Sequence, residues 1–308
     1  MDRRKWNLSE LPSAENHDST AKNSIAINLL FNPHGVKQFY QFHIHEKIWT
    51  NGSLHRNEIK KLLHLTIDQD RNGINQIHLE SFDRIHFDRN LALSEKEYLD
   101  NVASILDDVK LEVNKYGVEY QLKNHSEIHL KSKRTLEKLQ KNYVGGNAER
   151  QFRFLKTFYA NPKLILKDLL NYKQYGLLLP KFYGHYDVGQ EKEYAVRFTQ
   201  LMENMVVRIT EKVQINTVDE EKKILQLQVK GQFSEEINTE TCRFILTNRN
   251  IGFSENDKAV LNNYQGNFEI SKGSGLVKNS ELNIEFSFGE NYRKNILYSL
   301  KSIDYEEA

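Results

Sequence analysis

Long runs of alternating apolar and polar residues dominate the second half of the chain. After about residue 189, apolar side chains recur at every second position, which is the period of a strand with one buried face. The positions that follow this alternation are Val207, Ile209, Val213, Ile215, Leu225, Leu227, Val229, Leu282, Ile284, Phe286, Phe288, Ile296, Tyr298 and Leu300. The pattern predicts an antiparallel sheet with one wet face, as in a β sandwich or an open barrel.

A similar alternation near the start of the chain predicts a four-stranded meander. Its second strand alternates apolar residues with polar ones, namely Tyr40, Phe42, Ile44 and Ile48 with Gln41, His43, His45 and Lys47. Asn51-Gly52 is typical of a tight hairpin turn, and Leu63, Leu65 and Ile67 share one face of the next strand. The fourth strand is predicted to carry Ile77, Leu79, Ile85 and Phe87 on one face and His78, Glu80, Arg84 and His86 on the other.

Helical signals fill the region between these two sets of strands. Ser94 is predicted to begin a helix, with Glu97 placed to complete a capping box, and further helices follow from Ser126 onwards. The most apolar helix is predicted over Asn161–Tyr175, with Asn161 as its N-cap and Pro162 at its first position. Because apolar residues cover more than one stripe of this helix, we expect it to be buried from more than one side, at the centre of a helical layer.

These patterns predict an α+β fold, in which an N-terminal antiparallel meander with a helical layer is followed by a mostly antiparallel β sandwich or open barrel. We expect a flexible N-terminal arm over residues 1–23, an α+β domain over 24–187 and an antiparallel β domain over 188–308. The arm is polar except for Trp6, Leu8 and Leu11, which we expect either to pack back on the body or to bind a partner chain.

Charge and composition narrow the classes of function. The 308 residues include 43 Lys and Arg and 42 Asp and Glu with interleaved signs, so we expect no nucleic-acid partner. A basic side of the predicted second helix favours a solvated face or an acidic protein partner instead; it carries Lys131, Lys133, Arg134, Lys138 and Lys141. We expect no membrane span, no signal peptide and a cytoplasmic protein, and the Asn-, Lys- and Ile-rich composition is typical of an AT-rich bacterial gene.

The single cysteine, Cys242, excludes an intrachain disulfide and a cysteine-based zinc site. It lies in the segment 241–246, which we predict to be a strand with a buried, inert thiol. No phosphate-binding loop, dinucleotide fingerprint, nucleophile elbow or zinc-protease helix is present, so we expect no cofactor and a non-catalytic protein more readily than an enzyme.

Two groups of residues are weak metal candidates. The segment 68–73 resembles the start of a calcium loop through Asp68 and Asp70, but Leu79 stands where the bidentate acid should be, which favours a plain hairpin turn. His43 and His45 share one face of a strand and could meet other imidazoles, although solvated or partner-facing histidines explain them equally.

A possible ligand site lies where the two predicted domains meet. The segment there gathers aromatic and titratable side chains, namely Tyr183, His185, Tyr186 and Asp187. Ligand pockets favour such junctions, while packing of the junction is the simpler explanation.

The sequence leaves three hypotheses of function. The first is a non-catalytic interaction or structural subunit of a bacterial multi-protein assembly, such as an adaptor, a secretion-apparatus component or a toxin-neutralising partner. The second is a small-molecule or lipid-binding β barrel, with Leu282, Ile284, Phe286 and Phe288 lining its interior. The third is a metal-dependent hydrolase centred on His43, His45 and the segment 183–187. The sequence predicts neither the identity of the partner or ligand nor the oligomeric state.

Overall fold

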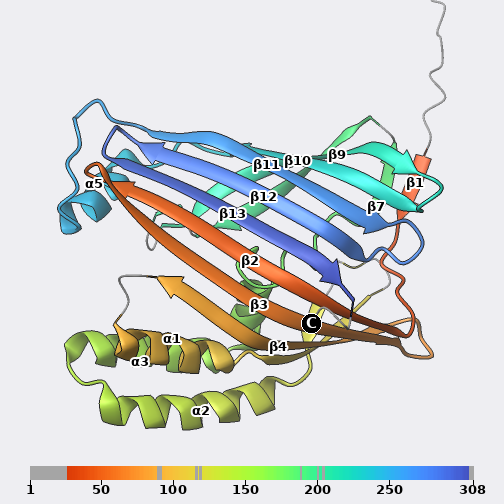
Figure 1. Ribbon diagram of the computed structural model, residues 1–308, viewed down its shortest axis with the longest axis horizontal. Helices are drawn as coiled ribbons and strands as arrows, with labels where there is room; N and C mark the ends of the chain where they lie inside the picture. Colours follow the sequence, from red (N-terminus) through yellow and green to blue (C-terminus); the bar gives the residue numbers. More distant parts are fainter. Residues whose placement is uncertain are drawn as a thin grey trace, which may run out of the picture.

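The structure is a computed structural model of the chain, and it describes residues 26–88, 92–114, 117, 120–187, 189–199, 201–202 and 205–304. A large, curved antiparallel sheet forms the body of the molecule, and three helices lie together along one side of it (Figure 1). The protein is mostly antiparallel β with a substantial helical part, so the α+β class is broadly confirmed.

The large sheet has 11 strands in the order β6-β5-β4-β3-β2-β13-β12-β11-β10-β9-β8, and its ends do not close into a barrel. Its strands are β2 (Val36–Thr50), β3 (Ser53–Gln69), β4 (Asn75–Asp88), β5 (Asp108–Val113), β6 (Tyr120–Leu122), β8 (Glu191–Phe198), β9 (Val207–Asp219), β10 (Ile224–Phe233), β11 (Ala259–Ser271), β12 (Val277–Phe288) and β13 (Tyr292–Ile303). A separate two-stranded sheet pairs β1 (Ala26–Leu29) with β7 (Gly184–Asp187).

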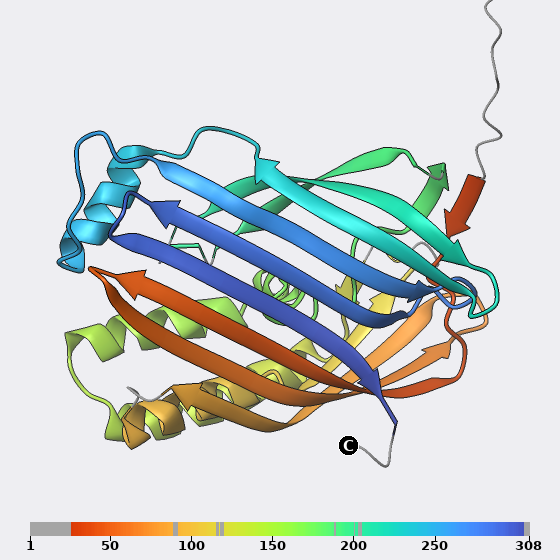
Figure 2. The same ribbon diagram turned by 45° about the horizontal axis from the view of Figure 1, so that its top comes forward.

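Five helices accompany the described strands. They are α1 (Leu93–Ser104), α2 (His125–Asn142), α3 (Gly146–Tyr159), α4 (Pro162–Leu169) and α5 (Thr239–Asn248). The first three are stacked beside β4 and the neighbouring strands, whereas α5 is separate from this group and lies at one end of the C-terminal strands (Figures 1 and 2).

Alternation in the strands sorts their side chains onto two faces. The face that packs on the helices and on residues 170–183, called the inner face below, carries the buried apolar residues, and the outer face is polar and partly exposed. The apolar positions predicted for the second half are all buried, which confirms the period-two interpretation. Leu282, Ile284, Phe286 and Phe288 are among them and pack in this core, in a sheet that stays open rather than around a barrel lumen.

One sheet contains strands from both predicted domains. Strand β2 pairs with β13 along most of its length, for example Ile44 with Tyr298 and Phe42 with Leu300. The N-terminal meander and the C-terminal strands therefore share a continuous hydrogen-bonded ladder and a continuous inner face. The boundary near residue 188 stays a prediction, and it falls between β7 and β8.

The predicted central helix is present but shorter than expected. Asn161 caps α4 by accepting from the backbone N–H of Lys163 and Leu164, and Pro162 takes the first position, as predicted. The helix ends at Leu169, and residues 170–179 continue as buried turns in place of the predicted helical end. Ile165 and Leu169 are fully buried while Leu164 is 40% exposed, so one stripe of α4, rather than its whole circumference, faces the core.

Three local predictions are wrong. The helix α1 has Ala92 rather than Ser94 as its N-cap, and Glu95 rather than Glu97 accepts from the backbone N–H of that residue. In β4, Asp83 has a positive φ of 47° and the register with β3 shifts nearby, so the alternation changes phase. Ile85 is therefore 45% exposed, while the His86 side chain turns to the inner face. The segment around Cys242 is the helix α5 rather than a strand. Asn238 caps the first turn of this helix, and Cys242 and Leu246, four residues apart, lie on its buried side.

Candidate functional site

The aspartates of the calcium-like segment build a hairpin turn. Oδ1 of Asp70 accepts from the backbone N–H of Asn72 and of Ile74, at 2.8 and 2.9 Å, while Asp68 pairs with Gln76 inside the ladder of β3 and β4. The carboxylate of Asp70 is thus used by the turn itself, as in an Asx turn. The structure supports the hairpin explanation of this segment.

His43, His64 and His78 of the meander point to the outer face, and each pairs with a single carboxylate. Nε2 of His43 lies 2.8 Å from Glu58 Oε1, and the ring of His45 stacks on His43 with centroids 6.3 Å apart. Within the part of the chain that the structure describes, no three His, Cys, Asp or Glu side chains are grouped to hold a metal ion.

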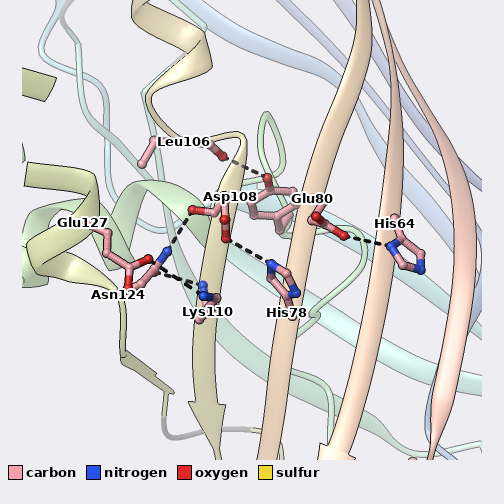
Figure 3. Close-up of polar contacts among 9 residues, drawn as sticks. His64, His78, Glu80, Leu106, Asp108, Lys110, Asn124 and Glu127 are labelled. Atoms are coloured by element: carbon pink, nitrogen blue, oxygen red, sulfur yellow. Dashed lines mark hydrogen bonds and ion pairs between the residues drawn. The ribbon is translucent and has the colours of Figure 1, made fainter. Parts of the chain in front are cut away.

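The same pairing continues across the neighbouring strands (Figure 3). His64 Nδ1 lies 2.9 Å from Glu80 Oε2, and His78 Nε2 lies 3.0 Å from Asp108 Oδ1. Each imidazole meets a carboxylate of the next strand, so the rings are spread along the sheet and do not converge on one point. Cross-strand pairs of this type stabilise a sheet modestly.

Two tyrosines of the junction segment are held by hydrogen bonds to backbone carbonyls. The Tyr183 hydroxyl donates to the carbonyl of Gly275 at 3.0 Å, and that of Tyr186 donates to the carbonyl of Phe182 at 2.6 Å. His185 is exposed and lies 3.8 Å from Asp187. Tyr183 precedes β7, which contains His185, Tyr186 and Asp187, and the role of these four residues as a ligand site stays a prediction. The predicted partner-binding residues Trp6, Leu8 and Leu11 lie outside the described residues, so their role stays a prediction.

A better candidate lies between the inner face of the sheet and the helices. A cavity of about 390 Å³, open to solvent on one side, is lined by residues of β2, β3, β4, α1, α3, α4 and the turns after α4. Its apolar lining is Phe42, Ile44, Ile59, Leu99, Val102, Ala103, Leu106, Phe154, Leu155 and Phe158. This volume lies within the usual range for sites of small organic ligands. We call it the Lys61 cavity, after the one lysine buried in its wall.

Lys61 is only 5% exposed, and its partners are unusual for a buried ammonium group. Its Nζ donates to Gln174 Oε1 at 3.2 Å and lies 4.8 Å from the ring centroid of Phe42 and 4.9 Å from that of Tyr175. Among the described residues no carboxylate forms an ion pair with it. One amide oxygen and two ring faces therefore replace the water that a lysine normally keeps.

Burial changes the protonation of the groups around this cavity. Desolvation lowers the pKa of Lys61 to about 7, with further lowering by Arg84 and Lys173 and opposition from Asp107 and Asp168. Burial also raises the pKa of the Asp168 carboxyl and lowers that of His86. Arg84 is paired with Asp107, whereas no carboxylate of the described residues lies within ion-pair distance of the Lys61 amine. Perturbed groups of this kind in a cavity are typical of functional sites.

A second buried ionisable group lies on the inner face at β9. Glu211 is 1% exposed, and its Oε1 accepts from the hydroxyls of Tyr172, at 2.7 Å, and of Tyr264. It lines a separate cavity of about 310 Å³ together with Tyr172, Phe182, Tyr194 and Phe198. Burial raises the pKa of this carboxyl, and the two tyrosine hydrogen bonds lower it in part.

Gly231 makes this second arrangement possible. Gly231 of β10 pairs with Glu211 of β9, and the ring of Tyr264 from β11 lies against Gly231. A Cβ on Gly231 would lie 2.4 Å from Cδ1 of Tyr264. The tyrosine ring therefore occupies the space that a side chain at position 231 would need. The glycine is required here by close approach, since its φ is not positive.

Sequence reasoning missed both Lys61 and Glu211, although a signal for them exists. Lys61 is in phase with Ile59, Leu63 and Leu65, and Glu211 is in phase with Ile209 and Val213. A charged residue at a buried phase of an alternating strand is rare, so each was a candidate from the pattern alone.

Comparisons with known proteins give no assignment. No protein-family model matches the sequence, and the search of curated proteins finds no match. The fold is similar to part of lipovitellin, in a solved structure on lipid–protein interactions in that protein, with a TM-score of 0.43 and 9% identity over 88% of this chain. The chain spans 25% of that lipovitellin chain.

It is also similar to DynF from the dynemicin biosynthesis pathway of Micromonospora chersina, with a TM-score of 0.21 and 4% identity over 98% of this chain and 96% of that one. Both scores are too low to carry an argument about function. Among the described residues, no helix has the length and apolar character that crossing a membrane requires.

Proposed function

We propose that this protein binds a small molecule with an apolar chain and an anionic, oxygen-bearing head group, and that the ligand occupies the Lys61 cavity. The observation that carries the proposal is the buried amine of Lys61, which lines a largely apolar cavity and forms no ion pair with a carboxylate of the described residues. A buried charge without a partner is costly, and a ligand carboxylate would supply the missing counter-charge.

The walls of the cavity suit an apolar chain. Phe154 is 67% exposed and Leu99 is 39% exposed, yet both line the cavity, so it reaches the surface beside them. An exposed phenylalanine stacked near Phe158 offers an apolar entrance from solvent towards the interior. Each methylene buried in such walls contributes about 0.8 kcal/mol to binding.

The charges at the wall favour an anionic head. Lys61, Arg84 and Lys173 line the cavity, and the only carboxylate among its described lining residues is Asp168. Burial raises the pKa of the Asp168 carboxyl, while Lys173, Asn171 and Lys61 lower it. A carboxylate held at Lys61 would in turn favour the ammonium form of the lysine, so binding would be accompanied by proton uptake.

Isothermal titration of the full chain with decanoate at about pH 7 tests the proposal, with decylammonium as a ligand of the same chain length and opposite charge. We expect decanoate to bind and Lys61→Met to weaken it at least about tenfold, which corresponds to about 1.4 kcal/mol. Lys60→Met is the matched control, because Lys60 neighbours Lys61 in β3 but lies on the outer face beside Glu58. Equal binding of the two ligands, or an equal effect of the two substitutions, would contradict the proposal.

A further inference from the structure

We propose that the amine of Lys61 also captures aldehydes with an apolar chain, by condensing with them to an imine inside the same cavity. This inference rests on the proposed function for access of an apolar chain to the cavity. It adds a covalent step that binding of a carboxylate does not require.

The geometry presents the amine as a nucleophile. Nζ of Lys61 has a single hydrogen-bond acceptor, Gln174 Oε1, and no described residue donates a hydrogen bond to it. A neutral amine in this position can donate one N–H to the amide and keep its lone pair for the cavity. The rings of Phe42 and Tyr175 on the amine restrict where the side chain can move, which orients the lone pair relative to a bound chain.

Protonation supports the same conclusion. Only the neutral form of an amine attacks a carbonyl, and an exposed lysine is about 0.1% neutral at pH 7.5. Burial lowers the pKa of Lys61 to about 7, so most of it is neutral at that pH. Arg84 and Lys173 strengthen this effect and Asp107 and Asp168 oppose it. Desolvated lysines of this kind are the usual partners of carbonyl substrates in proteins.

The reaction balances without an oxidant or reductant. The nitrogen lone pair adds to the carbonyl carbon, the carbonyl π electrons move to oxygen, and a proton passes from nitrogen to that oxygen. The carbinolamine hydroxyl then takes a proton from an acid and leaves as water while the nitrogen lone pair forms the C=N bond. The iminium nitrogen returns its proton to the conjugate base of that acid, which leaves the imine. Asp168 lines the same cavity, so its carboxyl is placed to give this proton to the hydroxyl and to take back the proton of the iminium nitrogen.

The test is reductive trapping. The full chain is mixed with one equivalent of decanal at about pH 7, cyanoborohydride is added to reduce any imine to a stable secondary amine, and the modified lysines are located by peptide mass mapping. We expect modification of Lys61 at least about tenfold above Lys60 and the other mapped lysines, as their protonation predicts. Wild-type protein in which label is spread evenly over exposed lysines would overturn the inference without any variant.

Lys61→Arg separates this inference from the proposed function. Arginine keeps the positive charge but does not form the imine under these conditions, so we expect decanoate binding to persist and the Lys61 adduct to disappear. Wild-type protein that binds decanoate but gives no adduct at Lys61 would refute imine formation alone. Protein that binds neither decanoate nor decanal would refute the proposed function as well.

Discussion

Lys61 and Glu211 are two buried ionisable groups on the same face of one sheet. They differ in how many hydrogen-bond partners the surrounding residues supply. Each lines its own cavity, and each meets a tyrosine from the turns that follow α4, Tyr175 for the lysine and Tyr172 for the carboxylate. Glu211 receives two hydroxyl hydrogen bonds on one oxygen, whereas Lys61 has one amide acceptor and two ring faces. Burial shifts both groups towards their neutral forms.

This difference in hydrogen-bond partners distinguishes a structural group, Glu211, from a candidate binding group, Lys61. Glu211 accepts hydrogen bonds from two tyrosine hydroxyls, and the absence of a side chain at Gly231 leaves room for one of them, Tyr264. No comparable set of acceptors surrounds Lys61 among the described residues, although Arg84 nearby has its own carboxylate, Asp107. We therefore interpret the Glu211 network as part of the core and the Lys61 cavity as a site whose polar contacts are completed by a ligand.

Gly231→Ala should cause the largest change in the free energy of unfolding, because it disrupts the hydrogen-bonded surroundings of Glu211. The new Cβ would displace the ring of Tyr264 and remove its hydrogen bond to Glu211. We expect the free energy of unfolding to fall by about 3 kcal/mol, from overpacking and a lost buried hydrogen bond together. Urea denaturation measures it, with Gly273→Ala as control, since a Cβ there meets no atom within 4 Å. Equal midpoints for the two variants would show that Tyr264 does not need this space.

Lys61→Met should raise the free energy of unfolding by about 2 kcal/mol at pH 6, since methionine fills similar space without a charge to desolvate. The folded pKa of about 7 lies below the value of 10.5 for a free lysine, so between these values the unfolded chain binds more protons. The stability of the wild type therefore rises with pH through this window, and its deficit relative to Lys61→Met shrinks. Denaturation of both proteins, and of Lys60→Met, at several pH values measures the gap. A gap that is constant with pH would mean that Lys61 is not desolvated.

The sequence predicted the strands and their buried faces well because alternation is a local signal. It predicted the cap and first turn of α4 for the same reason, since Asn161 and Pro162 act on adjacent backbone groups. It could not predict the phase change at Asp83, which depends on a bulge against β3 and brings His86 to the inner face. It also could not predict that β2 pairs with β13, a contact between residues more than 200 positions apart.

The two cavities depend on the same kind of long-range information. Lys61 and Glu211 could be marked as misplaced charges from the pattern, but their partners come from distant segments, Gln174 for one and Tyr172 and Tyr264 for the other. The turns after α4 deliver Tyr172, Gln174 and Tyr175, and that segment was predicted to be helical. A helix through these residues would have a different spacing of side chains, so neither site followed from the sequence.

Tyr172→Phe should give the smallest of the three effects, because it removes one donor of Glu211 and keeps the ring in place. We expect a loss of about 1 kcal/mol in the free energy of unfolding, the usual size for one buried hydrogen bond. The hydrogen bond from Tyr264 remains and still lowers the pKa of Glu211, but one bond lowers it less than two, so the carboxyl pKa should rise further above its ordinary value.

A raised folded pKa means that the folded protein holds a proton that the unfolded chain has released. Stability contributed by the protonated carboxyl is then complete below the unfolded pKa and is lost as pH rises through the folded one, which is the reverse of the slope at Lys61. Carbonyl-stretch infrared spectroscopy against pH, with Glu211→Gln to identify the band, measures the carboxyl directly. A band that titrates at its ordinary pH in wild type and variant alike would remove the contrast between the two buried groups.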